Sequence, residues 1–128
     1  MAEEPLQRLV KTEEQLLDKE LLAGVLEGLV FVDPSARRVI LTREARGLTA
    51  RELILVYLLG RKALAALTEG EFVEAASPKE IEGATGLPGG TVRPNLRKLY
   101  DDEIVETGDN GYTVPSYRLP EAANEIMD

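Results

Sequence analysis

The sequence predicts a mainly α-helical fold with a small amount of β structure, an α+β domain. Three observations support this prediction. Capping-box patterns, in which Ser or Thr is followed three residues later by Glu or Gln, mark helix starts at Thr12, Thr49 and Ser77. Apolar residues then recur at spacings of three and four, which is typical of amphipathic helices. Finally, Asn110-Gly111 lies between two short β-type runs and is a strong hairpin signal.

The composition fits one globular domain and removes several kinds of functional site. The chain has 128 residues, of which 44% are apolar, and this argues against disorder. It contains no Cys and no His, so it offers neither disulfides, nor the usual zinc ligands, nor the commonest general base. The sequence shows no nucleotide-binding loop and no nucleophile motif. We therefore expect no enzymatic activity, no cofactor and no metal.

The sequence also carries an expectation about location. No apolar run approaches the roughly 18 residues that a membrane-spanning helix needs. The first residues, MAEEPLQRLVKTEEQ, lack the basic-then-apolar order of a secretory signal. We expect a cytoplasmic protein with no membrane contact.

Residues 5–28 are expected to be helical, with Thr12 as a cap inside the segment. An apolar stripe follows this cap, formed by Leu17, Leu21, Leu22, Val25, Leu26 and Leu29. The stripe either packs on the core of its own chain or forms a homodimer interface, and the pattern fits both. Leu6, Leu9 and Val10 precede it and fit either a separate short helix or a continuation of the same one.

Residues 29–41 are expected to form a β-hairpin, because Asp33-Pro34-Ser35-Ala36 is a turn sequence between two β-type runs. Arg37 and Arg38 then stand at the start of the second strand. They serve either as a solvated strand edge, which discourages aggregation, or as contacts to an anionic partner. The segment 37–51 holds five arginines against one acid, so it is a candidate for phosphate contacts.

Thr49 opens a helix that we expect to continue to about Leu67. Its residues 53–59 are apolar without interruption, which implies burial on nearly every side. A buried strand would show the same run, but the cap and the length favour a helix. Gly60 inside it indicates a kink or a close contact. Residues 71–74 are predicted to form a short strand.

Residues 77–102 are expected to form a helix, a tight turn and a second helix. Ser77 caps the first helix, and Gly86 supplies the left-handed residue that ends it. Thr91 is predicted to cap the second helix, whose inward face is Val92, Leu96 and Leu99. A strand at 104–107, a turn at 108–111, a returning strand at 112–114 and a final helix at 120–127 complete the chain.

These residues carry a resemblance to a known family. Thr85-Gly86-Leu87-Pro88, followed by Thr91-Val92, Leu96, Leu99 and Ile104-Val105, resembles the helix–turn–helix of prokaryotic winged-helix regulators, and the likeness covers residues 50–119. It implies a winged-helix domain at 49–128, with a helix–turn–helix at 77–102, a wing at 103–119 and a C-terminal helix at 120–127. Residues 1–48 are then an extension, a helix plus a β-hairpin, with an expected role in dimerisation.

The resemblance also implies which residues face DNA, namely Arg93, Asn95, Arg97 and Lys98. This sequence departs from the family pattern at two positions. Glu103 stands where the family usually has glycine, and Pro94 lies unusually close to the reading positions.

The expected function is that of a homodimeric transcription regulator that reads double-stranded DNA in the major groove with the helix 91–102, assisted by Arg37 and Arg38. The net charge of −8 and a wing tip that carries Asp109 but neither Lys nor Arg favour an alternative. This is an acidic winged-helix module for protein–protein interaction, or a small subunit of a nucleic-acid machine. Tyr112 and Tyr117 in the wing region either pack internally or stack on bases.

Overall fold

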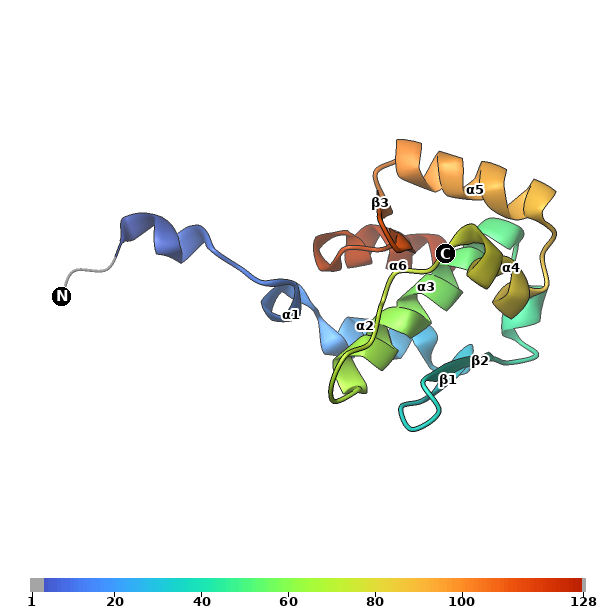
Figure 1. Ribbon diagram of the computed structural model, residues 1–128, viewed down its shortest axis with the longest axis horizontal. Helices are drawn as coiled ribbons and strands as arrows, with labels where there is room; N and C mark the ends of the chain where they lie inside the picture. Colours follow the sequence, from blue (N-terminus) through green and yellow to red (C-terminus); the bar gives the residue numbers. More distant parts are fainter. Residues whose placement is uncertain (1–3, 128) are drawn as a thin grey trace.

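The structure, a computed structural model, describes residues 4–127 and shows an α+β domain, as predicted (Figure 1). The helices in this range are α1 (Glu13–Leu16), α2 (Lys19–Leu26), α3 (Ala50–Leu67), α4 (Pro78–Thr85), α5 (Gly89–Asp101) and α6 (Leu119–Met127). Short 3-10 turns occupy Pro5–Leu9, Ala45–Gly47 and Ser116–Arg118. Two antiparallel hairpins are formed by β1 (Val30–Asp33) with β2 (Arg38–Leu41), and by β3 (Glu106–Gly108) with β4 (Gly111–Thr113). None of the helices within residues 4–127 has the length and apolar character of a membrane span.

Helix α3 lies at the centre of the fold, and the other elements pack around it (Figure 1). It starts at the predicted capping box, where the Thr49 hydroxyl accepts from the Glu52 amide at 3.2 Å and Glu52 accepts from the Thr49 amide at 2.9 Å. Every residue from 53 to 59 is buried. Gly60 marks a close contact, since a Cβ built there would lie 2.7 Å from Cγ1 of Val39 in β2.

The prediction of one helical segment over residues 5–28 is wrong in detail. The chain forms a 3-10 turn, α1 and α2 in succession, because Leu17 and Asp18 adopt extended backbone angles. The Asp18 carboxylate then accepts from the Leu21 amide at 3.0 Å and starts α2 afresh. The apolar stripe packs on its own chain, with Leu22, Val25, Leu26 buried and Leu17, Leu21, Leu29 partly buried against the same core.

One hydrophobic core runs through the whole domain. The buried cluster takes in Leu22 and Val30 from the predicted extension together with Leu58, Leu96 and Leu119 from the rest of the chain. Helix α2 contacts both α3 and α6. The extension therefore contributes to the core that also supports α4 and α5.

Residues 77–102 form two helices joined by a turn, as predicted, with one correction. Ser77 forms its capping box, and Gly86 has a φ of 77° that ends α4. Thr91 is not the cap of α5, because the extended Pro88 caps the helix and accepts from the Thr91 amide at 2.9 Å, so α5 starts at Gly89. Glu103, where the resemblance expects glycine, has the left-handed φ of 62°.

The second hairpin pairs with the chain at Ala76. Backbone hydrogen bonds of 2.9 and 2.8 Å join Ala76 to Tyr112 in β4. Residues 71–74, predicted as a strand, form none; the Arg61 guanidinium instead donates to the carbonyls of Val73 at 2.5 Å and Glu74 at 2.8 Å. The predicted strand at 104–107 starts at Glu106, after two buried residues.

Gly111 is the position where this hairpin depends on glycine, which gives a testable prediction. Its φ is 123°, and a Cβ built there would lie 2.2 Å from the Ala76 carbonyl oxygen. We expect Gly111→Ala to lower the free energy of unfolding by at least about 2 kcal/mol, because it adds backbone strain and breaks the Ala76 pairing. Chemical denaturation measures the effect.

Gly108→Ala in the same hairpin is the control, since a Cβ there meets nothing within 4 Å, and it should change stability by no more than about 0.5 kcal/mol. Equal effects of the two substitutions would contradict this account.

Candidate nucleic-acid interface

The turn between α4 and α5 is fixed by side-chain hydrogen bonds. The buried Thr85 hydroxyl donates to the Ile81 carbonyl at 2.6 Å and accepts from the Leu87 amide at 3.2 Å. The Arg46 guanidinium donates to the carbonyls of Thr85 and, at 3.4 Å, Ala84, which are free acceptors at the end of α4. These contacts hold the start of α5 at a defined angle to α4.

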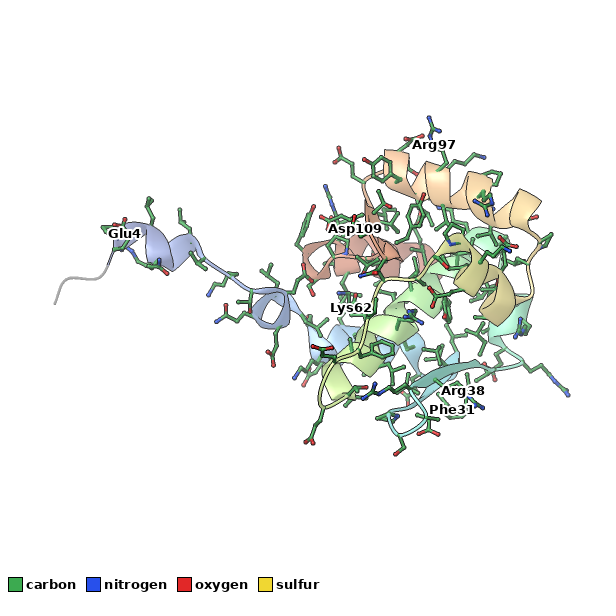
Figure 2. All side chains as sticks on the ribbon, in the orientation of Figure 1. Glu4, Phe31, Arg38, Lys62, Arg97 and Asp109 are labelled. Carbon is green, nitrogen blue, oxygen red and sulfur yellow. The ribbon has the colours of Figure 1, made fainter. Side chains whose placement is uncertain are left out.

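Helix α5 packs through one face and leaves the other in solvent. Val92, Leu96 and Leu99 are buried, as the spacing predicts. On the opposite side, the side chains of Arg93 and Arg97 are 61% and 81% exposed, and Lys98 is exposed beside them. Figure 2 shows Arg97 pointing outward from the surface of the fold. Three of the four predicted DNA-facing residues thus lie together as a row of cations on an exposed helix.

Two carboxylates flank this row. Glu82 lies 3.9 Å from Arg93, and Asp101 lies 3.7 Å from Arg97. Ion pairs this exposed and this long contribute only about 0–1 kcal/mol, so a phosphate can displace the carboxylates. Asn95 is partly buried, and its amide nitrogen donates to the Thr91 carbonyl at 2.8 Å, so this predicted contact residue is already engaged on its own helix.

The arginines of residues 37–51 do not form one surface with the cations of α5. Arg37 and Arg38 lie at the β1–β2 turn, across α3 from α5, and Figure 2 shows Arg38 and Arg97 on opposite sides of the molecule. Arg46 supports the end of α4, as described above. The Arg51 guanidinium pairs at 2.8 Å with both Asp102 and Glu125, so it ties the end of α5 to α6.

The second hairpin has an acidic surface. Asp109 at its tip and Glu106 in β3 are exposed. Arg118, which follows the hairpin in the chain, is already paired with Glu103 at 3.1 Å and Glu121 at 3.5 Å. Tyr112 packs against the core, whereas Tyr117 is 53% exposed.

Sequence reasoning missed a buried charge. Lys62 in α3 is 3% exposed, and its ammonium lies 2.9 Å from Glu74, 3.5 Å from Glu13 and 3.4 Å from the Ser116 hydroxyl. These groups line a cavity of about 330 Å³. Glu13 also accepts from the Ser116 amide at 2.8 Å, so α1 is docked on the domain through polar contacts. The only sequence signal is that Lys62 follows Leu58 and Leu59 at helical spacing, on the buried face.

Comparisons of the chain with family models, with curated proteins and with solved structures found no match. Within residues 4–127, no group of three or more carboxylates is arranged to hold a metal ion. The exposed row of cations on α5 is the feature that carries the functional argument.

The Glu13 contacts give a prediction about acid stability. Partial burial acts to raise the pKa of Glu13, but the Ser116 hydrogen bonds and the Lys62 charge outweigh it and lower the pKa below 4.5. Because the pKa of this carboxyl is lower in the folded state, the group stabilises the fold at pH values above its unfolded-state pKa. This contribution is lost as the pH falls through the folded-state pKa. We expect Glu13→Gln to reduce stability near neutral pH and to flatten its decline below pH 4.5. Denaturant titrations across acidic pH measure this. Glu14→Gln is the control, since that side chain makes neither contact, and it should retain the full decline.

Proposed function

We propose that this protein is a winged-helix DNA-binding protein, acting as a homodimeric transcription regulator with α5 in the major groove. The observation that carries the proposal is the row formed by Arg93, Arg97 and Lys98 on the solvent face of α5. The order α3, α4, α5, β3, β4 supports it, because it matches three helices followed by a wing. The bridge between Ala76 and β4 supports it too, since it ties the second hairpin to the segment before α4.

The shape and chemistry of α5 suit a duplex. The major groove of B-DNA is about 12 Å wide and admits one α-helix. Helix α5 has 13 residues and lies at the outer surface of the domain (Figure 1). Arginine binds guanine edges or phosphates with two parallel hydrogen bonds, whereas lysine acts as a point charge on phosphate. Arg93 and Arg97 are therefore the proposed reading residues, and Lys98 a phosphate contact.

Arg46 and Arg51 have a positioning role in this proposal. Arg46 holds the end of α4, and Arg51 holds Asp102 directly after α5. Both ends of the helix–turn–helix are thereby fixed by arginines that do not themselves face the duplex. Arg37 and Arg38 are left out of the proposed contact, because the β1–β2 turn lies across α3 from α5 (Figure 1).

A second candidate function is favoured by the acidic hairpin. Asp109 and Glu106 would face the phosphate backbone if the hairpin acted as a DNA-binding wing, and like charges repel. A basic protein partner would be attracted by the same surface. The second candidate is therefore a winged-helix module that binds protein, as an adaptor or small subunit of a nucleic-acid machine.

Binding to duplex DNA at two salt concentrations separates the two candidates. If α5 binds DNA, random duplex should bind at low salt and lose affinity steeply as salt rises, because bound cations release counterions from phosphate. The double variant Arg93→Ala/Arg97→Ala should weaken binding by about 1–3 kcal/mol for each bidentate arginine that is removed. Fluorescence anisotropy with labelled duplex measures both.

The matched control is Arg37→Ala/Arg38→Ala, which removes the same charge from the far side of the molecule. It should leave DNA affinity nearly unchanged. If the protein does not bind DNA at low salt, the DNA proposal is contradicted and the protein-binding candidate remains. If the two double variants weaken binding equally, α5 is not the contact surface.

The hairpin tip provides an independent prediction. If the tip lies near phosphate, Asp109→Lys should tighten DNA binding and steepen the logarithmic salt slope by about 0.9, because one further phosphate is neutralised. Salt titrations of the variant and the unmodified protein measure this slope. Glu20→Lys, an exposed reversal in α2, should produce a smaller change; an equal change would mean that net charge alone is responsible.

A further inference from the structure

The N-terminal segment Glu4–Val10, which we call the arm, projects from the body of the domain (Figure 1). Its three apolar side chains are exposed: Leu6 by 65%, Leu9 by 76% and Val10 by 56%. Leu6 and Leu9 are three residues apart in a 3-10 turn, so they share one side of it. The arm thus presents a small apolar face that its own domain does not cover.

An apolar groove lies on the same domain, between α2, the C-terminal half of α3 and β1. Two adjoining hollows of about 490 and 250 Å³ form it, and they share Ala23, Ala63 and Leu67. At its edges Phe31 is 67% exposed and Leu67 is 60% exposed. The groove is lined by buried Leu22, Leu26 and Val30, by small alanines, and by the exposed Phe31 and Leu67.

We infer that the arm of one copy binds in the groove of a second copy, and that the exchange is reciprocal. Leu6, Leu9 and Val10 would enter the groove as a short helical turn enters an apolar cleft. The charges agree with this placement. Lys19 lines one hollow and Glu27 lines the other, and the arm carries Glu4 and Arg8 with the opposite signs available to pair with them.

The way the arm joins the domain favours binding in the groove of a second copy over binding in the groove of its own chain. The capping box of α1 fixes the chain direction at Thr12, whose hydroxyl accepts from the Gln15 amide at 3.1 Å and whose own amide donates to Gln15 at 2.9 Å. Glu13 anchors α1 to Ser116 and Lys62. The arm runs outward from this anchored start of α1, away from α2 and α3 of its own domain (Figure 1).

The area available is sufficient for a specific dimer. Burying one large apolar side chain removes on the order of 100 Å² from water. Leu6, Leu9 and Val10 of the arm, with Phe31 and Leu67 of the groove, contribute five such side chains per copy. Two reciprocal contacts then bury on the order of 1,000 Å², which is about the minimum for a specific interface.

The inference extends the homodimer of the proposed function but does not depend on DNA binding, because the arm, α2 and β1 lie away from α5 (Figure 1). Its test is the mass of the full chain, measured by light scattering without DNA. The unmodified protein should be a dimer. Leu6→Asp/Leu9→Asp should be a monomer with an unchanged circular dichroism spectrum, since both side chains are exposed. A monomeric unmodified protein, or a variant that stays dimeric, would overturn the inference and leave the DNA titration unaffected.

Cross-linking tests the contact itself. The chain has no cysteine, so the single variants Leu9→Cys and Leu67→Cys can be mixed and joined with a short bis-maleimide. We expect a covalent dimer that links position 9 to position 67. Leu9→Cys mixed with Tyr100→Cys, also an exposed position but on α5, should give no such product. A link that forms only inside one chain, in the double variant Leu9→Cys/Leu67→Cys, would place the arm in its own groove and overturn the exchange.

Discussion

The burial of α3 is the constraint on which the rest of the structure depends. A helix that is apolar on every side for seven residues must be covered on every side, and no single neighbour can do that. The cover comes from β1 and β2 on one side and from α4, α5 and α6 on others. Each of these elements is short and could not bury its own apolar face alone, so each depends on α3 in turn.

This constraint explains why one face of α5 is free. Val92, Leu96 and Leu99 are used to cover α3, so the cations at intervening positions face water. In an acidic protein such a local row matters more than the net charge, since interactions between exposed charges fade within about a Debye length, roughly 8 Å at physiological salt.

The arginines have two different roles that composition alone does not distinguish. Arg46 and Arg51 are held by carbonyls and carboxylates of the domain itself, and their contacts span 39 and 74 residues of sequence. Lys62 plays a related part in the interior, where it joins α3 to α1 and to the 3-10 turn before α6. Charges that serve the fold in this way are not available to a ligand.

Local chemistry in the sequence was enough to determine most elements. The capping boxes at Thr12, Thr49 and Ser77, the left-handed Gly86 and the Asn-Gly turn were all found where they were predicted, because each depends on a few neighbouring residues. The inward face of α5 was also predictable, since helical spacing fixes it. The predictions were wrong where another group takes the same backbone hydrogen bonds. The Arg61 guanidinium binds the carbonyls of the predicted strand at 71–74, and Pro88 caps α5 ahead of Thr91.

Only the tertiary structure decided which charges remain free. The sequence placed Arg37, Arg38, Arg46 and Arg51 in one basic segment, whereas the fold sends the first two to the far side of α3 and engages the other two internally. It also showed that the α2 stripe is covered while the arm is not. Charge pairing and burial join residues far apart in the chain, so neither spacing nor composition can predict them.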